Sequence, residues 1–230
     1  MINLSVIVPF FNEEDYLEKS INRLLKNNIY EEILLVDNNS TDESSNIAKK
    51  LVENNKSISL YKTDEKKGKG VALSHAKEFI TSTHVVIHDA DLEYFPEDII
   101  EMFEESKDYP NSMILGSRFI GEKERKNVYT RTTLANKIMS LFFSVVNFYY
   151  ISDIATCYKL MPVDFYKKTT LKENGFSIEI EILSKFLKYN RSIKEVPIKY
   201  EGRSYEEGKK IKTSDGFKYL FNTLKYRFIK

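Results

Sequence analysis

Short runs of apolar and β-branched residues alternate with segments of helical spacing along the first half of the chain. The apolar runs predict strands buried on both faces at residues 4–9, 32–37, 57–61, 84–89 and 113–116. Apolar positions three and four apart predict helices at residues 13–25 and 71–81. Two further helices are expected to begin after a cap at Ser40 or Thr41 and at Pro96. This order, with short connections, predicts an α/β fold with a doubly wound, mostly parallel sheet.

The second half of the chain is patterned differently. Helical spacing covers residues 130–150, as one helix or two, and residues 178–189 and 215–229. Strands are predicted at residues 156–161 and 193–200, where Pro197 indicates an edge strand. Residues 201–213 form a polar, basic segment between the last strand and the last helix. Because the sequence has no linker, repeat or low-complexity tract, we expect one domain over residues 1–230.

The charge balance and the cysteine content limit the classes of protein to which this sequence can belong. The 230 residues include 35 Lys and Arg against 34 Asp and Glu, so the net charge of +1 does not predict nucleic-acid binding. The single cysteine, Cys157, cannot form an internal disulfide and is expected to be a small buried side chain, which suits a reducing compartment. Residues 1–14 lack the basic start of a signal peptide, and no stretch approaches the roughly 20 apolar residues of a membrane span. A cytoplasmic protein is expected.

Acidic residues follow two of the predicted strands, at the edge where such sheets bind ligands. Asp89 and Asp91, with Glu93 two residues further on, offer hard oxygen ligands for Mg²⁺ or Mn²⁺ carrying a diphosphate. The alternative is that these acids cap the next helix or face solvent. Asp37 also ends a strand, where it either accepts from a base or ribose or forms a turn with the asparagines that follow it.

Basic residues lie in the loops near the same edge. Lys69 stands between two glycines at a predicted helix start, which makes it a candidate phosphate contact, although its surroundings match neither a P-loop nor a dinucleotide motif. His88, beside the acids, is interpreted as structural. Five further cations lie outside the obvious helix faces and are either phosphate contacts or solvated charges: Arg118, Arg131, Arg203, Lys209 and Lys210.

Seven motifs occur in one order along the chain: VIVPFFNEE, LLVDNNSTD, GKGVAL, DADLEY, GSRF, DIATCYKL and GRSYEEGKKI. Their combination resembles the family-2 glycosyltransferases, and among these the polyprenyl-phosphate sugar synthases such as dolichyl-phosphate mannose and glucose synthases. The resemblance extends from about residue 4 to residue 228. It implies a GT-A fold, a nucleotide-sugar donor and a divalent metal, with residues 1–117 as the nucleotide-sugar-binding half and residues 118–230 as the acceptor side.

The resemblance also implies roles for individual residues. The metal motif is matched by Asp89 and Asp91, with Glu93 where some relatives supply a third ligand. The remaining positions of the donor side, which contact the nucleotide, its base or its phosphates, are Pro9, Asn12, Glu13, Asp37, Lys69, Arg203 and Lys209. On the acceptor side the matching positions are Arg118 and Arg131, near the acceptor phosphate, and Asp153, an acid near the acceptor subsite.

Three departures separate this chain from many of the relatives. Residues 37–40 read Asp-Asn-Asn-Ser where others have Asp-Asp-Gly-Ser, so one acid fewer is available for the base. Lys159 occupies a position that is commonly Arg. The C-terminal membrane helices of some relatives have no counterpart in the sequence.

The resemblance implies inverting transfer of a hexose from a GDP- or UDP-sugar to a polyprenyl or dolichyl phosphate. A phosphate acceptor is already an anion and needs positioning rather than a general base. A saccharide or protein hydroxyl, the alternative acceptor, would need a carboxylate base, for which Asp153, Glu179 and Glu181 are candidates. A helical spacing of two puts the two glutamates on different faces, and we expect Glu181 to be solvated. The further alternatives are a nucleotidyltransferase, disfavoured by a first loop without glycine, and a non-catalytic nucleotide-sugar-binding module.

The aromatic stretch at residues 141–151 has two interpretations. Beside an acceptor site it can lie in the membrane interface, as the basic and aromatic C-terminal helix also can. For the aromatic stretch the alternative is packing against the sheet, and for the C-terminal tail it is an ordinary helix end rich in cations.

Overall fold

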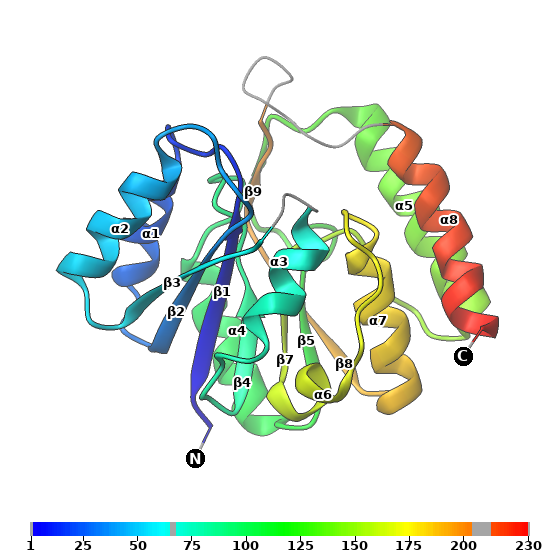
Figure 1. Cartoon of the computed structure of the whole chain (residues 1–230). Helices are drawn as coiled ribbons and strands as arrows, with labels where there is room; N and C mark the ends of the chain where they lie inside the picture. Colours follow the sequence, from blue (N-terminus) through cyan, green and yellow to red (C-terminus); the bar gives the residue numbers. More distant parts are fainter. Residues whose placement is uncertain (1, 65–67, 204–212, 230) are drawn as a thin grey trace.

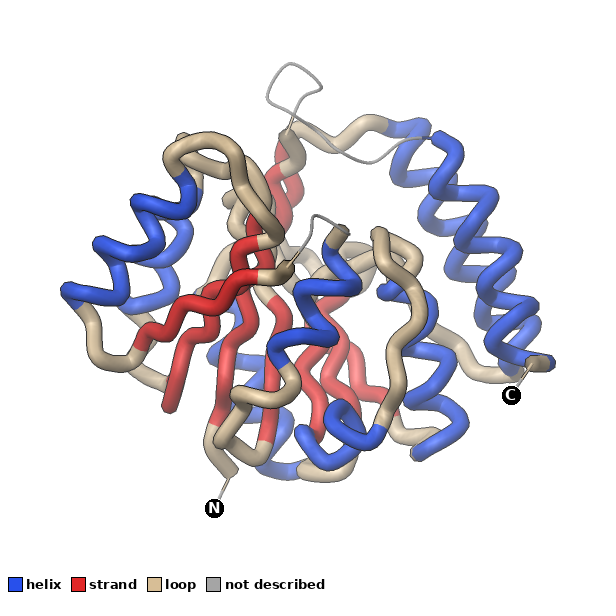
Figure 2. Tube along the Cα trace, viewed as in Figure 1, coloured by secondary structure: helices blue, strands red, loops and turns tan. Residues whose placement is uncertain are grey.

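The computed structural model describes residues 2–64, 68–203 and 213–229. Seven strands form one central sheet in the order β3-β2-β1-β4-β7-β5-β8, and two short strands, β6 and β9, pair beside it (Figures 1 and 2). The strands are β1 (Leu4–Phe10), β2 (Tyr30–Asp37), β3 (Ile58–Lys62), β4 (His84–Ile87), β5 (Met113–Ser117), β6 (Arg125–Lys126), β7 (Lys159–Pro162), β8 (Ile193–Pro197) and β9 (Tyr200–Glu201).

All neighbouring strands of the central sheet run parallel except β7, which is antiparallel to both β4 and β5. Because β7 runs the other way, its first residue, Lys159, lies at the edge where the parallel strands end. The central strands are almost fully buried, as their continuous apolar runs predict. β8 ends the sheet, which confirms the edge position indicated by Pro197.

Helices cover both faces of this sheet. They are α1 (Leu17–Leu25), α2 (Ser44–Asn54), α3 (Lys69–Ala76), α4 (Glu97–Asp108), α5 (Thr130–Asn147), α6 (Val163–Lys168), α7 (Ile178–Tyr189) and α8 (Thr213–Phe228). In the view of Figure 1, α3 and α7 lie in front of the sheet and α4 lies behind it, while α5 and α8 pack side by side at one end. Within the described residues, no helix is long and apolar enough to cross a membrane.

Several predicted boundaries differ from the structure, among them the three that follow. The helix after β2 begins at Ser44, and Asp42 Oδ1 accepts from the Ser44 N–H at 3.0 Å, so the prediction of Ser40 or Thr41 as the cap is wrong. α3 ends at Ala76, earlier than predicted. Residues 130–147 form one helix, which ends where Phe148 adopts a left-handed conformation with φ 49°.

Candidate functional site

A cavity of about 250 Å³ opens at the edge where the parallel strands end. Its wall combines strand-end loops, the start of α3, the first turn of α7 and one residue of α8. Apolar side chains such as Phe10, Phe176 and Tyr219 form part of this wall. The charged residues that line it are Glu13, Lys69, Asp89, Asp91, Glu93, Arg118, Glu179 and Arg203.

Three carboxylates follow β4 at this edge, as the sequence predicts. Leu92 has a left-handed φ of 63°, which turns the chain between Asp91 and Glu93. Glu93 accepts from Tyr200 Oη at 2.7 Å and from the Arg203 N–H at 2.8 Å. Burial, together with the negative charges of Glu93 and Asp89, raises the pKa of Asp91 to about 7, against the opposing effect of Arg203.

The charges that line the cavity fit a divalent cation. Among the described residues of its wall, five carboxylates face three basic groups, which leaves an excess of two negative charges. The described residues contain no group of three His, Cys, Asp or Glu side chains already arranged as metal ligands, and Asp89 and Glu93 each bond another side chain. A cation held through Asp91 and one neighbouring carboxylate, with water and diphosphate as the other ligands, is consistent with both observations. The assignment of Asp89, Asp91 and Glu93 as ligands stays a prediction.

Arg203 lies beside the carboxylates that line the cavity. Its Nη1 is 3.1 Å from Glu13 Oε2 and its Nη2 is 3.2 Å from Asp91 Oδ2, while the guanidinium stacks over Tyr16. A basic residue therefore already faces the carboxylates where a metal is predicted. Lys209, assigned to the same basic segment, and Lys210 lie outside the described residues.

Lys69 reaches the cavity from the first position of α3. Its Nζ lies 2.7 Å from Asp89 Oδ1, 2.8 Å from Glu179 Oε1 and 3.6 Å from Cys157 Sγ. Burial opposes the ammonium form, yet Asp89 and the other acidic neighbours raise the pKa of Lys69 well above its usual value. Burial likewise opposes the ionised form of Asp89, but Lys69 lowers its pKa below the usual range. The ion pair between Lys69 and Asp89 is thus fully charged at neutral pH.

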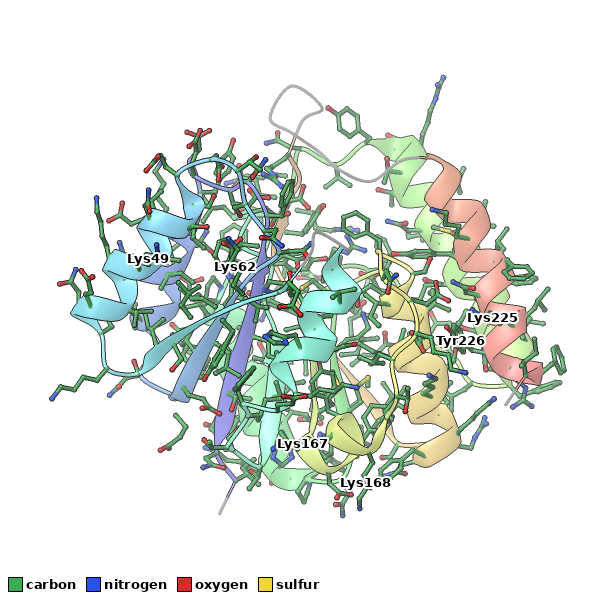
Figure 3. The ribbon with its side chains drawn as sticks, in the orientation of Figure 1. Lys49, Lys62, Lys167, Lys168, Lys225 and Tyr226 are labelled. Carbon is green, nitrogen blue, oxygen red and sulfur yellow. The ribbon has the colours of Figure 1, made fainter. Side chains whose placement is uncertain are left out.

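The two glycines beside Lys69 have a packing function. Residues 171–175 cross the start of α3, and the Gly70 N–H donates to the Asn174 carbonyl at 2.8 Å. A Cβ on Gly70 would lie 1.8 Å from the Glu173 carbonyl oxygen. Lys225 Nζ and Tyr226 Oη, both labelled on α8 in Figure 3, each bond Glu173 Oε1 at 2.7 Å. α8 therefore helps to hold this crossing segment against α3.

We expect Gly70→Ala to destabilise the protein by about 1–3 kcal/mol, because its methyl group would force the crossing segment away from α3. The change in the free energy of unfolding in urea measures this effect. Gly175→Ala is the matched control, since an added Cβ there meets nothing within 4 Å. Equal stability of the two variants would contradict the packing interpretation.

Arg118 lines the cavity, and Asp153 holds it there. Asp153 is fully buried and accepts from Arg118 Nε at 2.7 Å, Nη2 at 2.8 Å and the backbone N–H at 3.1 Å. The guanidinium also stacks on Tyr200, with 4.9 Å to the ring centroid. Asp153 does not line the cavity, so its contacts support positioning of Arg118 rather than contact with a substrate.

A second, small hollow of about 20 Å³ lies next to Arg118 and Tyr200, which line both spaces. Its other polar walls include Arg125 of β6 and Thr132 of α5. Arg131 is exposed on α5 and lines neither space. Arg125 escaped the sequence analysis because a two-residue exposed strand leaves no periodic pattern.

Some residues of the predicted nucleotide-binding turn line the cavity, and others support it from behind. Pro9 and Glu13 line the cavity, while Asn12, with a left-handed φ of 50°, accepts from the Thr41 N–H at 2.9 Å. Asp37 is buried, with its Oδ1 accepting from the Ser40 N–H at 2.8 Å and its Oδ2 from the Ser45 hydroxyl. In this structure Asp37 forms the turn that was its alternative interpretation, and Asn38 lines the cavity beside it.

The two glutamates of α7 face opposite surroundings, as their spacing predicts. Glu179 lines the cavity and bonds Lys69 and Lys159. Glu181 is fully buried, and its carboxylate accepts from the N–H groups of residues 172 and 173 at 2.7–2.9 Å, so the expectation that it is solvated is wrong. A buried acid that binds backbone N–H groups has the same sequence pattern as a solvated one.

Two further residues match their sequence interpretation. Cys157 is a buried free thiol. His88 is buried between Ser20 Oγ and Tyr158 Oη, each 2.9 Å away, and burial lowers the pKa of His88 to about 3. Its neutral ring supports the strand behind Asp89 and does not line the cavity.

Comparison with known proteins places this chain in a family. Residues 5–170 match the family described as Glycosyl transferase family 2. The chain is 27% identical over 241 residues to a UDP-N-acetylglucosamine–dolichyl-phosphate N-acetylglucosaminyltransferase of Methanococcus voltae, covering 95% of this chain and 94% of that protein. It is also 27% identical over 233 residues to a dolichol-phosphate mannosyltransferase of Pyrococcus furiosus, covering all of this chain and 64% of that protein.

Among solved structures, a similar fold occurs in glucosyl-3-phosphoglycerate synthase from Mycobacterium tuberculosis in complex with Mn²⁺, UDP and glucosyl-3-phosphoglycerate. The TM-score is 0.74 at 16% identity, over 98% of this chain and 80% of that one. At this identity the likeness shows the fold alone, which is the GT-A fold predicted from the sequence. Because the family match covers most of the chain, this protein belongs to glycosyl transferase family 2 and is a glycosyltransferase.

Proposed function

We propose that this enzyme transfers a hexose from a GDP- or UDP-sugar to a polyprenyl or dolichyl phosphate, with inversion and with Mg²⁺ or Mn²⁺. The observation that carries the proposal is that each of the three carboxylates considered as a general base is already bonded. Asp153 is bonded to Arg118, Glu181 to backbone N–H groups, and Glu179 to Lys69 and Lys159. A phosphate acceptor needs none of them, because it is already an anion.

The donor half of the proposal rests on the acidic cavity. Asp91, with Asp89 or Glu93, would hold the cation, which would neutralise charge that grows on the leaving diphosphate. Arg203 pairs with Asp91 at the same point and would contact that diphosphate if Asp91 held the cation instead. Lys69 lies at a helix start that borders the cavity, where its positive charge and the helix dipole favour phosphate.

The acceptor half rests on Arg118. Its guanidinium is fixed by Asp153 and by the Tyr200 ring, so a phosphate beside it meets a preorganised cation. The dolichyl-phosphate substrates in the names of two relatives support the same acceptor class. Arg131 would act only on an acceptor that extends over the start of α5.

An exposed apolar stripe on α5 supports attachment to a membrane surface. Leu134, Ile138, Leu141 and Val145 follow one another at intervals of four, three and four, and each is more than half exposed. α8 beside it exposes Phe221 and other large apolar side chains. A polyprenyl acceptor resides in a bilayer, so we propose that this helix pair lies on the cytoplasmic membrane face.

Leu141→Glu should reduce co-flotation with vesicles of phosphatidylglycerol and phosphatidylcholine by about tenfold or more, because it puts a charge in place of an exposed leucine that would be buried in the bilayer. Ile100→Glu is the control, since Ile100 is an exposed apolar residue of α4, away from the helix pair. Binding that is equally strong in both variants, or absent from the unsubstituted protein, would refute the membrane proposal.

The proposed reaction predicts nucleoside diphosphate release that requires both a metal and a lipid phosphate. Purified protein is mixed with UDP- and GDP-sugars, Mg²⁺ or Mn²⁺ and a short polyprenyl phosphate. Excess EDTA should abolish release, and restored Mn²⁺ or Mg²⁺ should return it. Transfer to a saccharide or peptide hydroxyl instead of the lipid would favour the alternative acceptor, while nucleotide-sugar binding without transfer to any acceptor would indicate a binding module.

A further inference from the structure

Four side chains of alternating charge run from the cavity wall into the sheet. Lys69 Nζ bridges Asp89 Oδ1 at 2.7 Å and Glu179 Oε1 at 2.8 Å. The other carboxylate oxygen of Glu179 bonds Lys159 Nζ, and this ammonium also donates to the Thr156 carbonyl. The order is therefore Asp89, Lys69, Glu179, Lys159, and each charge touches only charges of the opposite sign within this group.

The inner half of this group is costly to bury. Lys159 is 0% exposed and Glu179 is 3% exposed. A buried ion pair often contributes little net stability compared with apolar residues of the same size, so stability alone does not explain it. Glu179 stands in the first turn of α7, where the helix dipole favours a carboxylate, and Lys159 fixes its orientation. The pair therefore presents one fixed oxygen to Lys69.

The consequence for Lys69 is a fixed ammonium group. With Asp89 alone, a flexible lysine side chain could follow the carboxylate or swing to another acceptor. With Asp89 on one side and Glu179 on the other, the Nζ atom is held between two elements that converge on it, the strand-end loop after β4 and the start of α7. Preorganised cations stabilise developing charge without reorganising during the reaction.

We propose that Glu179 is a positioning residue that holds Lys69 in place beside Asp89, and that Lys159 acts through Glu179. The inference rests on the proposed function only in that Lys69 serves the donor diphosphate. Three other uses of Glu179 fit the contacts less well. As a base it would lose its ion pair with Lys69 or Lys159, as a metal ligand through Oε1 it would displace Lys69, and as a solvated residue it would be exposed.

The first test uses the protein without nucleotide or metal. N-hydroxysuccinimide acetate is added, and acetylation of Lys69 is followed by peptide mass spectrometry relative to Lys168, an exposed lysine labelled in Figure 3. Glu179→Gln should speed acetylation of Lys69 by about tenfold, because it removes one of the two ion pairs that hold the ammonium group. Glu195→Gln is the matched control, because Glu195 bonds Ser152 and not Lys69.

Two labelling results would overturn the proposal. One is an acetylation rate of Lys69 that is unchanged in Glu179→Gln, and the other is an acetylation rate of Lys69 in the unsubstituted protein equal to that of Lys168. Since this assay involves no donor or acceptor, its outcome is independent of whether the proposed reaction is correct. Conversely, a protein that shows the labelling effect but no lipid-dependent transfer would refute the proposed function and leave the positioning role of Glu179 in place.

The second test separates positioning from stability. Glu179→Gln should lower kcat by about 10- to 100-fold while the Kd for nucleoside diphosphate with Mn²⁺ does not rise, since the group acts through the placement of Lys69. Lys159→Arg should retain activity because it keeps the ion pair. The double variant Glu179→Gln/Lys159→Met, which removes both buried charges, should be no slower than Glu179→Gln alone. A kcat of the double variant below that of Glu179→Gln, or a Kd for nucleoside diphosphate that rises in parallel with the loss in kcat, would refute the proposed chain of contacts.

Discussion

Asp91→Asn should lower kcat/KM for nucleotide-sugar turnover on the order of 10³-fold, because the metal interaction it removes is worth several kcal/mol in the transition state. The fold should not suffer. Asp91 is crowded by Asp89 and Glu93, and its raised pKa shows that its negative charge is disfavoured there. The melting temperature of the variant should therefore equal or exceed that of the unsubstituted protein. Steady-state release of nucleoside diphosphate and a thermal melt measure the two quantities.

The control for this variant is Asp164→Asn, which removes an exposed carboxylate that bonds Lys168 and Tyr189 far from the cavity. We expect it to keep full activity. If Asp91→Asn were as active as this control at every metal concentration, Asp91 would have no metal role. A loss of activity accompanied by a large drop in melting temperature would instead indicate a structural role for Asp91.

The second large effect concerns Asp153. Asp153→Leu should destabilise the protein by about 3–5 kcal/mol, because it leaves the buried Arg118 guanidinium without its counter-charge. Urea unfolding measures this cost. The surface variant Asp164→Ala breaks an exposed ion pair and should change stability little.

A double variant distinguishes the pairing from a direct catalytic role. Arg118→Met/Asp153→Leu removes both buried charges and should recover most of the lost stability, because an apolar pair replaces an unpaired charge. Its activity should stay low, since the acceptor-side cation is gone. If Asp153→Leu folded as stably as the unsubstituted protein but were inactive, Asp153 would act on substrate directly rather than through Arg118.

The sequence alone predicts most strands of the main sheet and several of the helices that cover it. Residues 4–10 and 33–36 are near-continuous apolar runs, which occur in a sheet covered on both faces, so β1 and β2 are predicted within a few residues. α7 begins and ends as predicted, at Ile178 and Tyr189. The edge position of β8 follows from a single proline, because Pro197 has no N–H to donate to a neighbouring strand.

Strand order was harder to predict from the sequence, because it depends on pairing between distant segments. The predicted strand at residues 156–161 begins three residues later, at Lys159, and inserts antiparallel between β4 and β5. Nothing in its short apolar stretch specifies direction. β6 and β9 have two residues each, too few to show any alternation.

At the candidate site, position along a strand was a good guide and side-chain environment was not. Asp89, Asp91 and Glu93 reach the cavity because parallel strands end at a common edge. Arg131 matched a family position, yet the structure leaves it on the exposed side of α5. Asp153, Glu179 and Glu181 have the same chemistry in sequence, but their neighbours from distant segments give each a different role.

The antiparallel strand β7 also makes the central sheet depend on pairing between distant segments. β4 and β5 do not pair with each other; β7 (residues 159–162) pairs with both and joins them, although it lies far along the chain from β4 (residues 84–87). The block β3-β2-β1-β4 and the pair β5-β8 are therefore joined into one sheet only through β7. Such long-range pairing raises the contact order, which is expected to slow folding. β7 also brings Lys159 to the edge where the carboxylates after β4 lie, so this edge is complete only when the distant segments have paired.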